Sequence, residues 1–509
     1  MKAFLMFKDQ DFDLRRKLPW NEAALTQDLE LNTMFNAMAL EDKFLFNVAK
    51  GAVLSGFNND LETILYRQDI LKDCLKNPSI VRDIYDIAVG AIEGEKKSYW
   101  GSFSKYPGAI LYRSLELLQM SVGMLKRLRN IADEQADKFD SGGFRQFFTM
   151  LIRELGDEYF NCVENHLKEL KFPGGVLISA ELGQGNKGAN YALRKSEEKR
   201  QNWMQRIFSK KPPVYTYNVH PRDEGGFRAL AELKERGINL VANALAQSTD
   251  HILSFFNMLR TELAFYVGCL NLQGQLDPMG EPISFPLPTA SSERRQSFKE
   301  LYDICLALTM KQKIVGNDAN ADRKDLVIIT GANQGGKSTF LRSVGLAQLM
   351  MQCGMFVPAE SFCSSICDGL FTHYKREEDA TMKSGKLDEE LSRMSEIVDH
   401  ITSNPILLFN ESFAATNERE GSEIARQITS ALLEKGIKIM FVTHLYEFAH
   451  GFAGPKMENA LFLRAERQAD GRRTFKLVEG EPLQTSYGED LYRAIWDGER
   501  RATRPNALS

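Results

Sequence analysis

The sequence predicts a multidomain protein in which an all-α helical region is followed by an α/β domain. Apolar residues recur with a roughly 3.6-residue rhythm between residues 61 and 170, which indicates amphipathic helices. From about residue 325 onward, short apolar segments alternate with helical ones, as in folds with a parallel sheet. A glycine-rich segment separates the first of these apolar segments from the helical segment that follows it. These observations place helices in the first part of the chain and the sheet in the second.

Length and composition set the broad class of the protein. A chain of 509 residues with 43% hydrophobic and 26% charged residues can form about three or four structural units with buried cores. The net charge of −4 gives no global nucleic-acid signature, so any such contact must be a local patch. The seven cysteines show no paired spacing, which favours reduced thiols. We find no signal peptide and no apolar run of about 18 residues, so we expect a cytoplasmic protein without a membrane partner.

Three regions are expected along the chain. Residues 1–60 mix charged and aromatic residues at helical spacing and predict an N-terminal helical segment. Residues 61–319 predict a helical core with a long helix at 238–268, whose apolar stripe we attribute to packing within this region. Residues 320–509 predict the α/β domain. Its expected strands and helices lie at 326–330, 338–352, 406–410, 421–435 and 437–442.

An irregular stretch at about 173–230 predicts a small β-containing insertion in the helical region. Its segments VLISAEL (176–182) and VYTYNV (214–219) are typical of short strands. Basic residues gather in this stretch, and they form either a solvated linker helix or a contact with a nucleic-acid backbone. The residues of this basic cluster are Arg194, Lys195, Lys199, Arg200, Arg206, Lys210 and Lys211.

Residues 331–338 match the pattern G-x-x-x-x-G-K-[ST] of a phosphate-binding loop, or P-loop. Apolar residues 326–329 precede the loop and a helical stretch, 340–351, follows it, which is the context that such a loop requires. Glycines let backbone N–H groups surround the β- and γ-phosphates, and the helix start adds the positive end of its dipole. Lys337 adds a mobile positive charge, and the Ser338 hydroxyl can hold Mg²⁺. The alternative is a glycine-rich turn with a surface lysine.

The residues predicted to bind the phosphates therefore form one continuous segment. They are Gly331, Ala332, Asn333, Gln334, Gly335, Gly336, Lys337, Ser338 and Thr339.

A second apolar strand, at 406–410, ends in Asn410 and Glu411. In many ATPases with such a phosphate-binding loop, the corresponding strand ends in Asp-Glu. The Asp holds Mg²⁺ through water, and the Glu polarises the attacking water. Glu411 fits the role of the base, whereas Asn410 offers an amide oxygen without charge. We therefore predict Ser338, Asn410 and Glu411 around the metal, with weaker Mg²⁺ binding or slower hydrolysis. The alternative is that Glu411 is a surface acid at a strand end.

The segment IMFVTH (439–444) predicts a further strand that ends in His444. A histidine at the carboxyl end of a strand in such a sheet can sense the γ-phosphate. The alternative is a histidine with a purely structural role.

Several segments of the second half, taken in order, resemble the ATPase domain of the MutS mismatch-repair family, within the ABC-type ATPases. The segment 329–346 resembles the family's P-loop, with Ala332 where proline is usual and Gln334 where methionine is usual. NESFAATNEREG (410–421) aligns without a gap, so that Asn410 stands for the family's Asp and Glu411 for its Glu. Further resembling segments are GMFVPAES (354–361), GLFTH (369–373), VTHLYEF (442–448) and SYG (486–488). The resemblance implies ATP and Mg²⁺ as cofactors and catalysis by Lys337, Glu411 and His444.

The segment SGKLDEEL (384–391) resembles the family's signature loop, in which Ser384 and Glu389 match. Lys386 stands where an aromatic residue is usual. In the family this loop reaches the nucleotide of the other subunit, so the resemblance implies a homodimer in which Ser384 contacts ATP. The alternative is an acidic helix start.

The upstream part resembles the family more weakly. Residues 60–77 resemble the start of its helical core and lever domain, and residues 259–272 resemble the helix that descends from the lever. The chain begins almost at the lever, which leaves no room for the N-terminal domain that reads mismatches, and it ends soon after residue 488. The resemblance therefore implies a divergent, shortened MutS-related protein.

The function implied by the resemblance is an ATP-dependent, DNA-binding protein of DNA repair or recombination. ATP-driven closure of a dimeric ATPase would move its helical levers. Without a mismatch reader, we expect backbone contacts that are selective for branched or distorted DNA. Two alternatives from other classes stay open: an ABC-type ATPase that acts on the ribosome or RNA, and a nucleotide-gated scaffold with little turnover.

Overall fold

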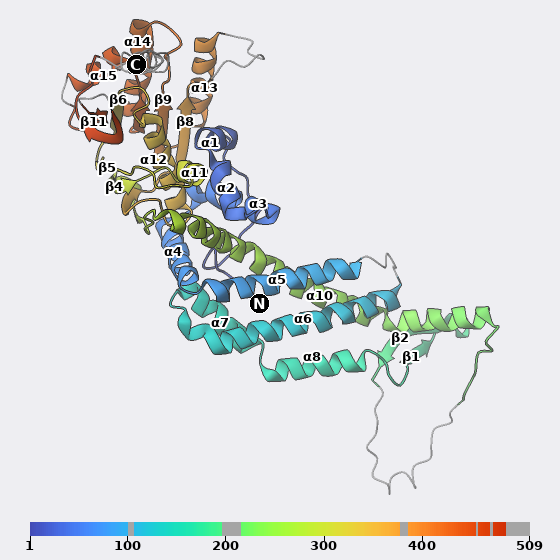
Figure 1. Ribbon diagram of the computed structural model, residues 1–509. Helices are drawn as coiled ribbons and strands as arrows, with labels where there is room; N and C mark the ends of the chain where they lie inside the picture. Colours follow the sequence, from blue (N-terminus) through green and yellow to red (C-terminus); the bar gives the residue numbers. More distant parts are fainter. Residues whose placement is uncertain (100–105, 196–214, 377–384, 455–456, 469–471, 485–509) are drawn as a thin grey trace, which may run out of the picture. The chain divides into compact units, whose positions relative to one another are not determined.

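The computed structural model divides the chain into two compact units (Figure 1). The first contains residues 1–3, 79–139 and 144–260, and the second contains residues 4–78, 140–143 and 261 onward. Within these, the structure describes residues 1–99, 106–195, 215–376, 385–454, 457–468 and 472–484. A multidomain chain with many helices and mixed sheets is thereby confirmed, while the predicted domain boundaries stay predictions. No helix in the described ranges is long and apolar enough to span a membrane.

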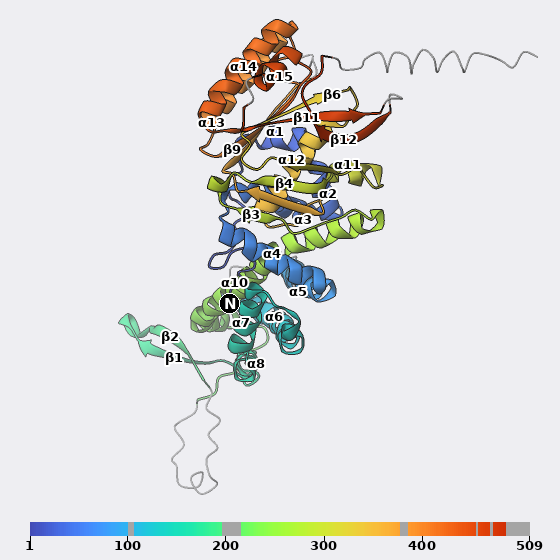
Figure 2. The ribbon, with the colours of Figure 1, turned by 90° about the vertical axis from the view of Figure 1, so that its left-hand side faces the viewer.

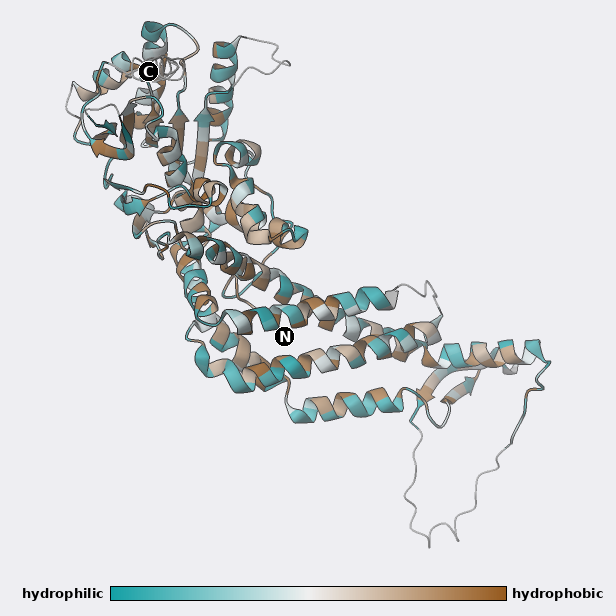
Figure 3. Cartoon of the chain, in the orientation of Figure 1, coloured by the Kyte–Doolittle hydropathy of each residue, from teal (hydrophilic) through white to brown (hydrophobic). Residues whose placement is uncertain are grey.

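Long helices dominate the first unit. They are α5 (Pro78–Tyr99), α6 (Pro107–Gln135), α7 (Gly142–Glu154), α8 (Asp157–Glu169) and the first part of α10 (Glu224–Leu276). The buried apolar residues of this unit lie mainly in α5, α6 and α7, and Figure 3 shows apolar and polar residues interspersed along these helices. At the start of α6, the Glu235 carboxylate of α10 accepts a hydrogen bond of 2.7 Å from the Gly108 N–H, which satisfies one free donor of the helix end.

A β-hairpin of strands β1 (Leu177–Leu182) and β2 (Gly188–Arg194) also belongs to the first unit. The strand predicted at 176–182 is confirmed as β1, whereas its partner β2 was not predicted. The strand predicted at 214–219 is wrong, because its described residues, 215–219, have no regular structure. Tyr215 and Tyr217 are 92% and 83% exposed, so their alternation with polar residues marks no buried face.

A six-stranded sheet forms the centre of the second unit, in the order β12-β11-β6-β10-β9-β8 (Figure 2). All neighbours pair in parallel except β11 and β12. The strands are β6 (Leu326–Gly331), β8 (Gly369–Tyr374), β9 (Pro405–Asn410), β10 (Lys438–Val442), β11 (Ala460–Arg467) and β12 (Arg473–Glu479). Strands β6, β9 and β10 are apolar and buried almost throughout, as parallel strands covered on both faces must be.

Four helices connect the strands of this sheet. They are α12 (Lys337–Gln352), α13 (Lys386–His400), α14 (Glu418–Glu434) and α15 (Tyr446–Ala453). The strands and helices predicted between residues 326 and 442 are confirmed to within three residues at each end. The alternation of strand and helix could be predicted because each segment carries its own apolar periodicity.

A second, four-stranded sheet precedes and flanks the first, in the order β3-β7-β4-β5. Its strands are β3 (Leu287–Thr289), β7 (Ser361–Ser365), β4 (Gln296–Leu301) and β5 (Asn317–Asn320). These short strands did not stand out in the sequence, since their residues are only partly apolar and three of the strands lie in a turn-rich junction.

Between residues 22 and 54, the predicted N-terminal helical segment forms helices that pack within the second unit. They are α1 (Glu22–Asp28), α2 (Leu31–Ala39) and α3 (Lys43–Leu54), followed by α4 (Leu61–Lys76); α11 (Ile304–Met310) packs on α2. The Asn21 amide donates to the Leu370 carbonyl of β8 over 2.8 Å. The buried Asp28 forms an ion pair of 2.9 Å with Arg376, just beyond the end of β8. The segment thus supports the sheet edge.

The carboxyl end of α12 is attached to the region around the start of α4. The Asn59 amide donates to the Gln352 carbonyl over 2.9 Å, and the buried Arg67 guanidinium donates to the Cys353 carbonyl over 3.3 Å. A cation at this end of a helix also meets the negative end of its dipole. The helix that begins at the glycine-rich loop is therefore held at its other end by the N-terminal part of the second unit.

Candidate functional site

The carboxyl ends of strands β6, β9 and β10 meet at one edge of the six-stranded sheet. Val442, the last residue of β10, pairs with Asn410 on one side and with Ile329 on the other. The segments that follow these strands therefore emerge side by side. Ligands in open α/β sheets bind at this edge, beyond the carboxyl ends of the strands.

The glycine-rich loop (residues 331–336) is shaped by close contact with β11. Gly331 has a φ of 107°, and a Cβ at Gly335 would lie 2.6 Å from the Cβ of Ala465. Neither position accepts a larger residue without displacement of β11. Helix α12 begins directly after Gly336, and no side chain caps its first turn. Its first N–H groups, together with the positive end of the helix dipole, are suited to an anion.

Lys337 is a buried cation that two backbone carbonyls hold. Its Nζ donates to the oxygens of Gly331 and Ala332 over 3.1 and 3.0 Å, and it forms no ion pair with a carboxylate of the described residues. Burial lowers the pKa of Lys337 to about 8, although the nearby charge of Glu411 opposes the shift. The ammonium group therefore lies inside the loop without a neutralising partner in contact.

The Ser338 hydroxyl donates to the Oδ1 atom of Asn410 over 2.8 Å. Two of the three predicted metal ligands are thus adjacent, and both are neutral oxygens. Among the residues that the structure describes, no group of three or more His, Cys, Asp and Glu side chains could hold a metal ion by itself. The arrangement fits Mg²⁺, which binds proteins through one or two oxygens and takes the rest from phosphates and water.

Glu411 and His444 face each other across the ends of β9 and β10. The Nε2 atom of His444 lies 3.2 Å from Oε1 of Glu411. The hydrogen bond from His444 lowers the pKa of the Glu411 carboxyl, which burial would raise, so Glu411 is ionised at neutral pH. About a third of each side chain is exposed, which leaves the pair accessible from this edge. Glu411 adopts a left-handed backbone with a φ of 53°, while its N–H donates to the Val442 carbonyl.

The structure brings together most of the predicted site residues. Residues 331–339, which include Lys337 and Ser338, form the loop and the start of α12. Asn410, Glu411 and His444 lie beside them at the neighbouring strand ends. Ser384 and the segment 486–488 lie outside the described residues, as do Lys199, Arg200, Arg206, Lys210 and Lys211 of the basic cluster. The functional roles assigned to these residues stay predictions.

Three residues near the site were not predicted from the sequence. Arg473 of β12 donates to the Asn333 carbonyl over 3.2 Å and supports the outer side of the loop. His373, at the end of β8, contacts Ser412, which directly follows Glu411. The signal for His373 was present in the sequence, because it stands near the end of an apolar strand as His444 does.

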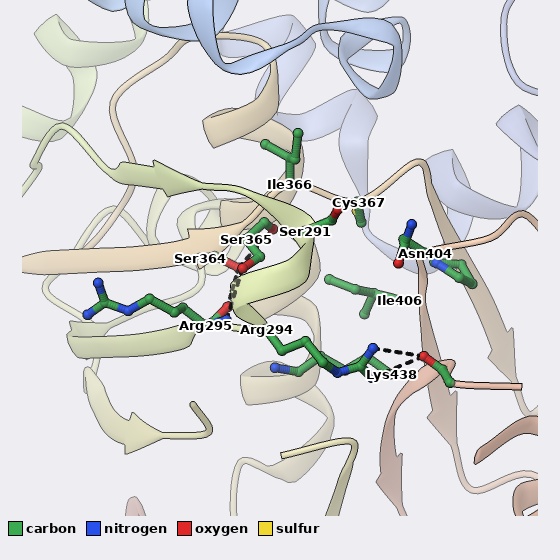
Figure 4. Close-up of a pocket in the computed structure, with 12 residues that line it drawn as sticks. Ser291, Arg294, Arg295, Ser364, Ser365, Ile366, Cys367, Asn404, Ile406 and Lys438 are labelled. Atoms are coloured by element: carbon green, nitrogen blue, oxygen red, sulfur yellow. Dashed lines mark hydrogen bonds between the residues drawn. The ribbon is translucent and has the colours of Figure 1, made fainter. Parts of the chain in front are cut away.

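A different pocket lies at the amino ends of β9 and β10 (Figure 4). Arg294 and Lys438 line it, and each already donates to a backbone carbonyl. The Arg294 guanidinium donates to the Gly436 carbonyl over 3.0 Å, and Nζ of Lys438 donates to the Ala321 carbonyl over 3.3 Å. Within the described residues, this edge of the sheet has no glycine-rich loop followed by an α-helix, so we do not assign the site to it.

Comparisons with known proteins match both halves of the chain. The model of the MutS2 N-terminal domain matches residues 59–279, and that of MutS domain V matches residues 327–495. A DNA mismatch repair protein MutS from Thermotoga neapolitana is 31% identical over 41% of this chain and 26% of its own length. An endonuclease MutS2 from Thermus thermophilus is 33% identical over 42% of this chain and 29% of its own length.

A longer match extends over both halves. The DNA mismatch repair protein MutS of Lactobacillus delbrueckii subsp. bulgaricus is 24% identical over 76% of this chain and 49% of its own length. This chain therefore spans about a quarter to a half of the length of these curated relatives. Because the two domain models match in the expected order, on the helical region and on the α/β domain, the chain belongs to the MutS family.

Proposed function

We propose that this protein binds and hydrolyses ATP at the carboxyl edge of its six-stranded sheet. One observation carries the proposal: the uncapped start of α12, a buried lysine, a hydroxyl–amide pair and a carboxylate–histidine pair converge at that edge. Phosphoryl transfer to water requires a helix start that binds phosphate, a position for a metal ion and a base for the attacking water. The names of the MutS relatives support the family, and their full activities are proposals for this chain.

Each group has a distinct role in this mechanism. The backbone N–H groups of residues 333–338 and the ammonium of Lys337 bind the β- and γ-phosphates, which replace the carbonyl partners of the lysine. Ser338 and Asn410 provide oxygens for Mg²⁺, which would neutralise charge on the phosphates. Glu411, held ionised by His444, orients the attacking water and accepts its proton. His444 lies beside this carboxylate and is placed to respond to the γ-phosphate.

Asn410 distinguishes this site from one with two acids. Its Oδ1 atom carries no formal charge and already accepts the Ser338 hydroxyl, so it attracts a hard cation less than a carboxylate does. Slow turnover follows. The same observation favours a second candidate function, in which the protein is a nucleotide-gated scaffold that closes on ATP and rarely hydrolyses it.

A role on DNA extends the proposal. The relatives are named for DNA mismatch repair and for endonuclease activity. We propose that two copies close on ATP as a homodimer in the cytoplasm and bind distorted or branched DNA through backbone contacts. Within the second unit, the connection of α12 to Asn59 and Arg67 gives nucleotide binding a direct path to α4, where the helical region begins.

Calorimetry with ATP and Mg²⁺ tests the central claim, and phosphate release tests turnover. The wild-type protein should bind ATP and release phosphate, whereas Lys337→Ala should do neither at the same concentrations. If the protein binds ATP but shows no phosphate release that depends on Glu411, the nucleotide-gated scaffold is favoured. Absence of ATP binding would contradict both functions. A gel-shift series with duplex, mismatched and branched DNA, in the presence of a non-hydrolysable ATP analogue, tests the DNA role, and no binding to any of them would remove it.

A further inference from the structure

His373 is a fully buried histidine whose two ring nitrogens are both engaged. Nδ1 lies 2.7 Å from the Ser412 hydroxyl, and Nε2 lies 2.9 Å from the backbone carbonyl of Glu390 in α13. The ring also stacks on Phe413, with centroids 5.2 Å apart. His373 therefore connects the end of β8, the segment after β9 and helix α13.

The partners determine where the proton of the ring lies. A carbonyl oxygen can only accept a hydrogen bond, so Nε2 carries the ring proton and donates a hydrogen bond to the Glu390 carbonyl. Burial lowers the pKa of His373 to about 4, so the ring is neutral and Nδ1 accepts. The single proton of the Ser412 hydroxyl is available to Nδ1 and to the His373 carbonyl, which lies 2.6 Å away. The Ser412 hydroxyl thus lies against the end of β8, within hydrogen-bond distance of two acceptors that share its one proton.

The backbone on both sides of Ser412 is in an unfavourable conformation. Glu411 and Phe413 have φ values of 53° and 61°, in the left-handed region that residues with side chains seldom adopt. Such backbone is strained for a residue that carries a Cβ atom. Surrounding contacts must therefore impose this conformation, and it sets the direction in which the Glu411 carboxylate leaves the end of β9.

Helix α13 contributes to the same region through Glu390. Its backbone carbonyl accepts a hydrogen bond from Nε2 of His373. Burial raises the pKa of the Glu390 carboxyl, and a hydrogen bond from the Phe413 N–H opposes the shift. One residue of α13 therefore contacts both His373 and the backbone two residues beyond Glu411.

We propose that His373 is a positioning residue for Glu411, and that through it the orientation of the Glu411 carboxylate depends on the position of α13. The inference rests on the proposed function, since it assigns Glu411 as the base. His373 is fully buried near the end of β8. It acts through Ser412, by holding the left-handed turn that aims the carboxylate at the site. A shift of α13 changes hydrolysis without a change in the residues that bind phosphate.

Substitutions at His373 can separate its two hydrogen bonds. His373→Asn keeps a polar group near the position of Nδ1 and loses the contact with Glu390. His373→Gln places an amide near the position of Nε2 and loses the contact with Ser412. Ser412→Ala removes the hydroxyl alone. Ile397→Val, a mild change in the buried face of the same helix, is the matched control for α13 packing.

We expect kcat for ATP hydrolysis to fall about tenfold to a hundredfold in Ser412→Ala and His373→Gln, which is the range for small misplacements of a catalytic group. ATP affinity should change less than twofold, because Lys337 and the loop are intact. His373→Asn should retain more activity than His373→Gln. Ile397→Val should behave as the wild type. Unchanged kcat in Ser412→Ala, or parallel losses of affinity and kcat in all variants, would overturn the proposal.

Hydrogen exchange of the protein without nucleotide gives a readout that does not depend on turnover. Ser412→Ala should raise exchange both in residues 411–413 and in the first turns of α13, whereas Ile397→Val should not affect residues 411–413. If the wild-type protein shows no ATPase activity, the proposed function fails and the exchange data still decide the coupling. Faster exchange that is confined to residues 411–413 would contradict the link to α13.

Discussion

Two buried lysines lie at opposite ends of the same sheet and differ in what surrounds them. Burial lowers the pKa of both Lys337 and Lys438 to about 8, and both donate to backbone carbonyls. At the carboxyl end, Lys337 is the first residue of the uncapped helix α12, directly after the glycine-rich loop, and the charge of Glu411 acts on it. At the amino end, Lys438 lies beside Arg294, whose guanidinium is paired with Asp325 and the Gly436 carbonyl.

The contrast shows that a perturbed pKa alone does not identify a functional site. Desolvation shifts a lysine in the same direction wherever it is buried. What differs is the local backbone: Lys337 opens an uncapped helix directly after a glycine-rich loop, whereas Lys438 begins strand β10. An anion can replace the carbonyl partners of Lys337, because the loop offers it further donors. We therefore pair each substitution at the carboxyl edge with a matched one at the amino edge.

The largest difference is expected for ATP binding by the two lysine variants. Lys337→Ala should weaken ATP binding about a thousandfold, since several charge-assisted hydrogen bonds to phosphate are lost. Lys438→Met should change it less than twofold. Titration calorimetry with Mg²⁺ measures both. Equal losses in the two variants would mean that the carboxyl edge is not the nucleotide site.

The next comparison is between two acids that accept hydrogen bonds, Glu411 at the carboxyl edge and Asp322 at the amino edge of the sheet. Glu411→Gln should reduce kcat about a hundredfold or more by removal of the base, while ATP still binds. Asp322→Asn, at the amino edge, removes a carboxylate that pairs with Arg295 over 3.7 Å and should leave kcat within twofold. Single-turnover phosphate release distinguishes loss of chemistry from loss of binding. A Glu411→Gln protein with normal turnover would exclude this residue as the base.

How much of the site could be predicted from the sequence depends on how local each signal is. Lys337 and Ser338 stand in one short motif between a strand and a helix. Asn410, Glu411 and His444 lie at or within two residues of the end of an apolar strand, so parallel pairing brings them together. Lys438 also borders an apolar strand, but at its start.

Contacts between distant segments could not be predicted in the same way. The contact between His373 and Ser412 joins residues 39 positions apart, and its meaning depends on the left-handed backbone around Ser412. The short strands of the second sheet and β2 were missed because they lack a clear apolar alternation. The hydrogen bond from Arg67 to the carboxyl end of α12 requires a fully buried guanidinium, which no sequence pattern predicts.

Lys438 should also make stability depend on pH. Its pKa in the folded state, about 8, lies below the ordinary lysine value of 10.5, so the folded protein binds fewer protons than the unfolded chain between these two values. The free energy of unfolding should therefore rise with pH from 8 to 10.5, by up to about 3 kcal/mol from this group, and this gain is lost as the pH falls through 8.

Denaturant unfolding at several pH values checks this effect. Other groups titrate in the same range, so Lys438→Met is the necessary comparison. The variant should be more stable than the wild type at pH 7, and the difference should shrink toward pH 10.5. A difference that is independent of pH would show that the ammonium of Lys438 is not desolvated.

The smallest effect is expected from one charge added at either end of β9. Asn410→Asp places an anionic oxygen where Asn410 now accepts the Ser338 hydroxyl, so Mg²⁺ should bind more tightly and kcat should rise about tenfold. Asn404→Asp adds the same charge just before the amino end of β9 and should change neither. Phosphate release over a Mg²⁺ titration compares the variants at equal ATP saturation. If Asn410→Asp lowers the Mg²⁺ requirement but leaves kcat unchanged, a step other than chemistry limits turnover, as the nucleotide-gated scaffold would require. If it changes neither quantity, Asn410 does not contribute to the metal position, and the neutral oxygen beside Ser338 serves only to hold the start of α12 against β9.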